Sequence, residues 1–185
     1  MLHEYLYVKV RKSVGKESSP SLGCIDSQSV KTTAVNGGLE TGYDGGKKVK
    51  GRKRHIIVDT MGLLMCVIVH RADIQDRDGA KLLLDRLYEN RWAFSRLKVI
   101  LADGGYAGKL IDWFKKTYQH LGWICRVVKR LQQKSFQIIP KRWIVERTFA
   151  WLCNFRRLSK DYERMTNTSE AFIQLAMIRI MLNKL

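Results

Sequence analysis

The sequence has few cysteines and no long hydrophobic run, and these two shortages exclude several classes of protein. Its four cysteines, Cys24, Cys66, Cys125 and Cys153, are too far apart for paired zinc ligands or for the disulfide framework of a small secreted domain. No apolar stretch approaches the ~20 residues that span a bilayer, and the first residues lack the basic start and apolar core of a secretory signal. We therefore expect a soluble, cytoplasmic protein whose cysteines are free, buried thiols.

Acidic residues are also scarce. The 185 residues include 17 Asp and Glu against 34 Lys and Arg, which gives a formal net charge of +17. Because basic side chains bind phosphates and release condensed counterions, this surplus favours DNA or RNA as partner, with a membrane surface as the alternative. Charge alone does not distinguish an enzyme from a simple nucleic-acid-binding protein. The length is typical of one domain, and 45% hydrophobic residues suffice to build its core.

The chain is predicted to consist of a lead-in, residues 1–23, and a folded domain, residues 24–185. The lead-in would be part of an N-terminal segment: residues 1–12 fit either a strand or a helix fragment, and residues 13–23, with one of only two prolines, indicate a flexible connection. A glycine-rich stretch further on leads into the basic run 47–54, and we expect this loop to be mobile.

Hydrophobic periodicity predicts an α/β fold. Strands are expected at residues 24–30, 55–60, 63–69, 98–103 and 123–128, the second and third joined as a hairpin. Helical spacing of apolar residues is found at 80–87, 110–114, 145–155 and 167–182, where Asn167 and Glu170 have the spacing of a capping box. Three hairpin-linked strands followed by alternating helices and strands specify a mixed five-stranded sheet with helices on both faces.

Several polar and aromatic residues have simple structural explanations. Those expected to cap a helix are Asp73, Asp76 and Asp78. Asp59 is explained by the hairpin turn that follows it, and His55 and His70 are expected to be ordinary strand-end residues, because Mg²⁺ disfavours imidazole. Trp143 and Trp151 could stack on an extruded base, although aromatic residues on a helix more often belong to the core.

Three acidic residues stand where metal-dependent phosphate chemistry would need them. Asp26 lies within a strand, Asp103 ends another, and Glu146 lies on a helix face away from the main apolar stripe. Phosphodiester cleavage develops negative charge on the attacking and leaving oxygens, which two Mg²⁺ ions held by carboxylates can stabilise. Each acid also has a structural interpretation: Asp26 could bond to neighbouring turns, Asp103 could cap a helix, and Glu146 could pair with Arg142 or Arg147.

Four motifs in order carry a family resemblance: Ile25-Asp26-Ser-Gln-Ser-Val-Lys31, Gly51-Arg-Lys-Arg-His-Ile-Ile-Val-Asp59, Leu101-Ala-Asp-Gly-Gly-Tyr106 and Arg142-Trp-Ile-Val-Glu-Arg-Thr-Phe-Ala-Trp151. From about residue 20 onward the chain resembles the DDE transposases of bacterial insertion sequences, of the IS-five type. The resemblance implies an RNase H-like fold in which Asp26, Asp103 and Glu146 are the catalytic residues and metal ligands. It also implies Mg²⁺, replaceable by Mn²⁺, cleavage of transposon ends to a 3′ hydroxyl, and strand transfer into target DNA by two-metal phosphoryl transfer.

The partner that the resemblance implies is double-stranded DNA, both transposon ends and target. The residues expected to hold its backbone are Lys47, Lys48, Lys50, Arg52, Lys53, Arg54, Arg142, Arg147, Arg156 and Arg157. Such phosphate contacts carry little sequence information, and a solvated charged surface is the alternative for the run 47–54. Because two ends must be brought together, we expect a homodimer on DNA, located at the nucleoid, with an upstream-frame N-terminal product as a further candidate partner.

One departure from the family pattern concerns the basic site near Glu146. Family members often carry a basic residue seven positions after the catalytic Glu, where this chain has Cys153, so that Arg156 or Arg157 could take over the phosphate contact. Ile139 also replaces a tyrosine of related signatures. Beside an active transposase domain, two readings stay open: an inactive remnant that only binds DNA, and an RNase H-like nuclease or resolvase without strand transfer.

Overall fold

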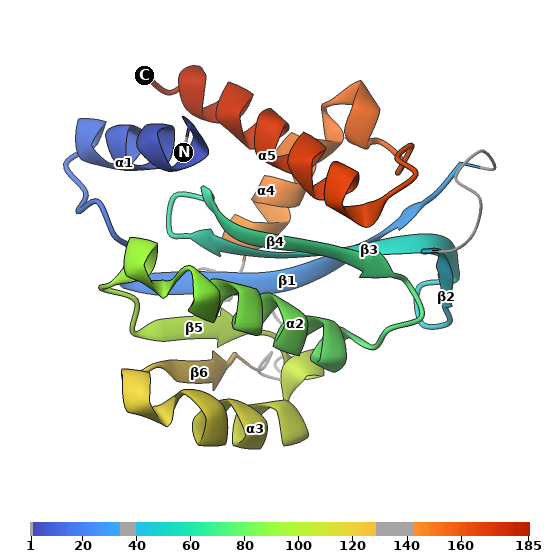
Figure 1. Ribbon diagram of the computed structural model, residues 1–185, viewed down its shortest axis with the longest axis horizontal. Coiled ribbons are helices and arrows are strands. Elements are labelled where there is room, and N and C mark those ends of the chain that lie inside the picture. The colour runs from blue at the N-terminus through green and yellow to red at the C-terminus, as the bar shows by residue number, and fades with distance from the viewer. Residues whose placement is uncertain (1, 34–39, 129–142) are drawn as a thin grey trace, which may run out of the picture.

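The computed structural model describes residues 2–33, 40–128 and 143–185, and its centre is one mixed sheet (Figure 1). The strands are β1 (Leu22–Lys31), β2 (Gly42–Asp44), β3 (Val49–Asp59), β4 (Leu64–Arg71), β5 (Val99–Ala102) and β6 (Ile124–Val127). The five longer strands lie in the order β4-β3-β1-β5-β6, and the short β2 pairs with the start of β3. β1, β3 and β4 run antiparallel, whereas β5 and β6 continue the sheet parallel to β1. The predicted mixed, RNase H-like sheet is thus confirmed.

Helices cover both faces of this sheet, as predicted. They are α1 (Leu2–Ser13), α2 (Asp76–Glu89), α3 (Lys109–Tyr118), α4 (Trp143–Cys153) and α5 (Thr166–Leu182), with 3-10 turns at Arg91–Phe94, Gly104–Tyr106, Gln119–Leu121 and Arg156–Leu158. In Figure 1, α2 crosses in front of the sheet and α4 lies behind it. The sheet is buried between them, since Ile56, Ile57 and Val58 on β3 and Leu83 on α2 have no exposed surface.

The N-terminal residues form a helix that belongs to the folded body. α1 lies beside α5 (Figure 1). Leu6, Tyr7 and Val10, on one face of α1, are buried in the core. Arg11, at the end of the same face, forms a buried ion pair with Asp59 on β3. Of the two conformations expected for residues 1–12 the helix is therefore correct, and it packs as part of the folded body.

The basic run 47–54 is a strand for most of its length, which corrects the expectation of a mobile loop. β3 begins at Val49, and β2 pairs with it so that Tyr43 lies opposite Lys50. Repeated Lys and Arg conceal a strand in the sequence because their long side chains show no apolar alternation. The fold nevertheless places every second side chain of the run on the same face.

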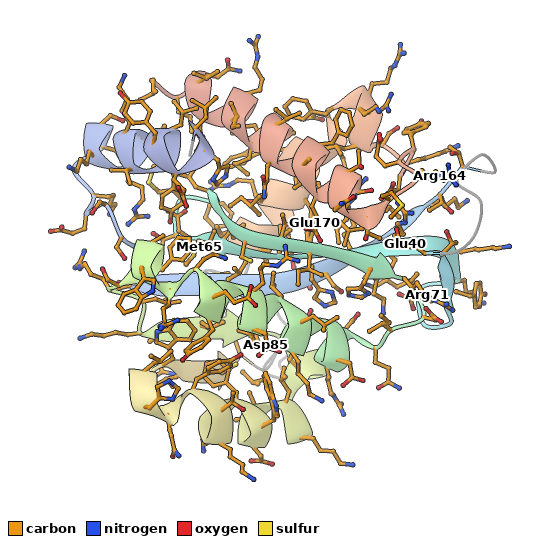
Figure 2. The ribbon with its side chains drawn as sticks, in the orientation of Figure 1. Glu40, Met65, Arg71, Asp85, Arg164 and Glu170 are labelled. Carbon is orange, nitrogen blue, oxygen red and sulfur yellow. The ribbon has the colours of Figure 1, made fainter. Side chains whose placement is uncertain are left out.

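α5 is held to the sheet by an acid that was expected to cap it. Glu170 accepts hydrogen bonds from the backbone N–H of Val69 on β4 (2.9 Å) and from Arg86 on α2 (3.0 Å). Figure 2 shows Glu170 between α5 and β4. The N-cap position of α5 belongs to Met165, whose side chain makes no cap bond. The N–H of Thr166 instead donates to the carboxylate of Glu40 (2.7 Å). The predicted helix is correct, but its capping box is not formed.

Two expectations about the environment of the protein can be compared with the structure. Within the described ranges, no helix combines the length and the apolar character that crossing a membrane requires. The cysteines are free, as predicted, and Cys24 is buried. Cys66 and Cys125 are half-buried and Cys153 is exposed, so the prediction of four buried thiols is correct only for Cys24.

Candidate active site

Asp26 and Asp103 are brought to the same place by the parallel pairing of β1 and β5. Cys24 lies opposite Leu101 in this ladder, and two residues farther along each chain stand Asp26 and Asp103. Because alternate residues of a strand share a face, this register puts the two carboxylates on neighbouring positions. Oδ1 of Asp26 accepts a hydrogen bond from the N–H of Ser27 (2.7 Å), and Oδ1 of Asp103 accepts one from Gly105 (2.8 Å).

The hydroxyl of Tyr106 lies in the electrostatic field of both acids. The side chain is buried, and burial, followed by the negative charges of Asp26, Asp76 and Asp103, raises its pKa well above the ordinary value. Tyr106 therefore stays protonated within electrostatic reach of both predicted catalytic aspartates. The glycine turn that carries it is fixed by Asp103, which caps the turn, and by Arg77 at the start of α2, whose Nε donates to the carbonyl of Gly105 (3.0 Å).

Glu146 lies in the first turn of α4 and is exposed. Cys153, two helical turns later, shares its side of the helix. The amide of Gln28 on β1 donates to Sγ of Cys153 (3.5 Å), and Gln28 in turn shares a face of β1 with Asp26. The side of α4 that carries Glu146 therefore looks toward the face of β1 that carries Asp26.

These carboxylates supply the chemistry that a hard divalent cation requires, since oxygen ligands suit Mg²⁺ and Mn²⁺. Their placement from two adjacent strands and a facing helix fits a shared ion. In the ranges 2–33, 40–128 and 143–185, however, no three acidic, histidine or cysteine side chains are gathered closely enough to hold a metal as a group. The fold thus brings Asp26 and Asp103 together and leaves Glu146 on the facing helix as the separate third member.

A fourth acid, Asp76, stands close to this region. It was expected to cap α2, but Gln75 holds the N-cap position, and Asp76 instead pairs with Nζ of Lys53 (2.9 Å). Burial would raise the pKa of Asp76, but the hydrogen bond from Lys53 and the charges of Lys47 and Lys53 outweigh it and lower the pKa. The sequence showed that Asp76 lies at the start of a helix directly after the hairpin. It did not show that Lys53 is its partner.

Three of the residues expected to bind DNA face the protein interior instead. Arg52 and Arg54 have 0% and 1% of their surface exposed, and Lys53 has 5%. Arg52 pairs with Asp161 (3.1 Å), and Arg54 donates to the carbonyls of Leu158 (2.8 Å) and Lys160 (3.2 Å). Arg52 and Arg54 thus join β3 to the segment between α4 and α5, whereas Lys53 pairs with Asp44 and Asp76. The structure therefore does not support phosphate contacts for these three residues.

Other basic residues of the predicted set are exposed. They are Lys47, Lys48, Lys50, Arg156 and Arg157. Nζ of Lys47 donates to the carbonyl of Ser27 (3.2 Å), directly after Asp26, so this ammonium borders the acidic site. Arg157 pairs with Glu163 (2.7 Å), and Arg142 lies outside the described residues.

Arg147 is half-buried and lies between two indoles. Its guanidinium carbon lies 4.5 Å from the ring centre of Trp143 and 4.6 Å from that of Trp151. Its Nη2 donates to the carbonyl of Met61 (3.0 Å) in the turn between β3 and β4. Arg147 therefore joins α4 to the hairpin and lies beside both tryptophans, and its contact with DNA stays a prediction.

His55 and His70 form a buried pair under α2, which corrects the expectation of ordinary strand-end residues. Nδ1 of His55 lies 2.8 Å from Nε2 of His70, and Nδ1 of His70 lies 2.8 Å from the carbonyl of Arg71. A Cβ added at Gly79 on α2 would lie 2.3 Å from Nε2 of His70, so the helix can approach the pair only because residue 79 has no side chain. The pair thus belongs to the packing between sheet and helix.

Comparison with known proteins adds to this geometry. A family model described as the transposase DDE domain matches residues 17–181. Over 139 residues the chain is 30% identical to a protein from Burkholderia cepacia named "Putative transposase for insertion sequence element IS402", covering 73% of this chain and 64% of that protein. The chain thus spans 64% of the length of this relative. A solved structure, the catalytic core domain of BIV integrase, is similar with a TM-score of 0.49 and 15% identity, over 86% of this chain and 82% of that one.

Proposed function

Since this chain belongs to the family of transposase DDE domains, we propose that it is the catalytic part of a DNA transposase, which cleaves transposon ends and joins them to target DNA. The observation that carries the proposal is the register of β1 and β5. It brings Asp26 and Asp103 side by side inside the region that matches the family, under the helix that bears Glu146. Matching motifs alone would not require these residues to meet in space.

The proposed reaction consists of two displacements at phosphorus. Water first attacks the phosphodiester at the transposon end and releases a 3′ hydroxyl, and this hydroxyl then attacks a phosphodiester of the target. Asp26, Asp103 and Glu146 would hold Mg²⁺ or Mn²⁺. When bound, these ions would supply positive charge where negative charge develops on the attacking and leaving oxygens.

The chain's own basic residues would orient the DNA. Lys47 borders the acidic site through its bond to Ser27, and Lys48 and Lys50 are exposed beside it, so this edge of the sheet is suited to the phosphate backbone. Arg156 is exposed after the end of α4. These contacts would place the scissile phosphate near Asp26 and Asp103 without reading its sequence.

Assembly is part of the proposal. Two transposon ends must be held together, so the active form would be a homodimer on DNA, at the nucleoid. The relative is longer than this chain, and an upstream-frame N-terminal product is the further partner that we propose. A catalytically inactive DNA-binding protein is the competing outcome.

A strand-transfer assay tests the function. Purified chain is incubated with Mg²⁺ or Mn²⁺, a plasmid target and oligonucleotides that carry the flanking genomic ends, with and without the upstream product. We expect joined products that are abolished by Asp103→Asn, while DNA affinity is retained. Asp112→Asn, which removes an exposed acid on α3, is the matched control and should leave the products unchanged. Cleavage without joining would indicate a nuclease, and DNA binding without either product would indicate an inactive protein.

A further inference from the structure

The turn between β3 and β4 is organised by one buried carboxylate, that of Asp59, which is fully buried. Its Oδ1 accepts hydrogen bonds from the backbone N–H groups of Met61 (2.8 Å) and Leu63 (2.9 Å). The N–H of Gly62 also bonds to the carbonyl of Asp59 (3.0 Å). The path of the backbone through residues 60–63 is therefore fixed from its inner side.

The second oxygen of Asp59 is held by the N-terminal helix. The hydroxyl of Tyr7 donates to Oδ2 (3.1 Å), and Nη1 of Arg11 forms its ion pair with the same atom. Arg11 is itself buried, and its Nε donates to the carbonyl of Glu17 (2.7 Å). α1 thus supports the carboxylate that supports the turn.

The outer side of the same turn holds α4 through two adjacent residues. Arg147 donates to the carbonyl of Met61, and Oγ1 of Thr148 donates to that of Gly62 (2.9 Å). Gly62 has a φ of +80°, and a Cβ there would lie 2.8 Å from Oγ1 of Thr148. The helix and the turn are therefore in close contact, and a shift of the turn must move this part of α4.

Glu146 directly precedes these two anchoring residues. We propose that Asp59 is a positioning residue for Glu146: acting through the β3–β4 turn, it determines where the first turn of α4 presents its carboxylate. The inference rests on the proposed function, because it takes Glu146 as a metal ligand. It matters because that carboxylate is not gathered with the two aspartates by strand pairing, and misplacement of a catalytic group by about 1 Å can cost on the order of 100-fold in rate.

The same inference gives α1 a role in the site. The family model begins at residue 17, after this helix has ended. Tyr7 and Arg11 nevertheless reach the turn through Asp59. The helix would therefore contribute to the geometry of the catalytic centre from outside the matched region, by holding a residue that holds the turn.

Mn²⁺ binding to the full chain, measured from the loss of the free-ion EPR signal, tests the inference independently of strand transfer. We expect Asp59→Asn to weaken Mn²⁺ binding by about 10- to 100-fold, as when groups that orient metal ligands are lost. Asp161→Asn is the control, because it breaks an equally buried ion pair, that with Arg52, far along β3. It should lower the melting temperature but leave Mn²⁺ affinity within about twofold of wild type.

Two further variants make the outcome decisive. Thr148→Val removes the hydroxyl that donates to the turn and leaves Asp59 in place. It should also weaken Mn²⁺ binding, so the test survives if Asp59→Asn does not fold. Glu146→Gln separates the two proposals. If it weakens Mn²⁺ binding while Asp59→Asn and Thr148→Val do not, the positioning role is refuted and the metal site stands. If Glu146→Gln has no effect, the metal role of Glu146 and the inference fail together.

Discussion

Mild acid is expected to destabilise this protein through its two buried, neutral histidines. The carbonyl of Arg71 can only accept, so Nδ1 of His70 must carry a proton and Nε2 of His70 must present its lone pair. Nδ1 of His55 therefore carries the proton of the bond between the rings. Adding a proton to Nε2 of His70 would break this bond and bury a positive charge. Protonation of His55 as well would bury a second positive charge beside the first.

The magnitude follows from the pKa of His55. Burial, followed by the neighbouring His70, lowers this pKa from 6.5 to about 3, and burial also lowers the pKa of His70. Above pH 6.5 both states of the protein are neutral at this residue. Below it the unfolded chain binds a proton that the folded chain refuses, so stability falls as the pH falls from 6.5 toward 3. At about pH 5, His55 alone should cost about 2 kcal/mol of unfolding free energy.

Urea unfolding followed by tryptophan fluorescence, at about pH 7.5 and about pH 5, measures this loss. The variant His55→Asn can keep a donor toward His70 but cannot titrate, and its loss of unfolding free energy should be smaller by about 2 kcal/mol. His120→Asn, at an exposed position, is the control and should behave as wild type. A wild-type loss below about 1 kcal/mol, or an unchanged loss in His55→Asn, would refute the reasoning.

Two further predictions concern packing and DNA binding. Gly79→Ala should lower the unfolding free energy by about 1–3 kcal/mol, because the new Cβ would overlap Nε2 of His70. Gly104→Ala is the control and should leave the unfolding free energy unchanged, because no atom lies within 4 Å of a Cβ there. Equal urea midpoints for the two variants would contradict this prediction. Replacing the three lysines of residues 47–50 by alanine should reduce the slope of log affinity against log salt by about 0.9 for each lost phosphate contact. The three lysines of residues 109–116 on α3 are the matched control, and an equal effect there would show that no particular surface meets the DNA.

Much of the sheet could be predicted because its signals are local. The alternation of residues in β1 and the apolar run of β5 defined two strands, and a parallel connection between them sufficed to suggest that Asp26 and Asp103 are neighbours. The same local signals placed Glu146 on a helix face away from the apolar stripe, where the structure has it exposed. The periodicity of apolar residues thus predicted which face of its helix or strand each residue occupies.

Several features that the sequence did not reveal depend on partners distant along the chain. Arg52 and Arg54 looked like surface cations until the fold supplied Asp161 and the carbonyls that follow α4, more than 100 residues away. α1 was taken for a lead-in because its short, polar sequence does not reveal that Arg11 reaches Asp59. Glu170 had the spacing of a capping box, yet a backbone N–H of β4 receives its carboxylate. A buried ion leaves no periodic trace in the sequence.

The contact between Glu170 and β4 also bears on how molecules of this protein meet one another. A strand at the border of a sheet is a template on which a strand from another chain can add, because its backbone donors and acceptors point outward. At Val69 the outward N–H already donates to the carboxylate of Glu170, which Arg86 holds in place. Glu170 is labelled in Figure 2. An incoming strand would have to displace a charged group from its own helix, so the sheet is protected at this point from growing into an aggregate.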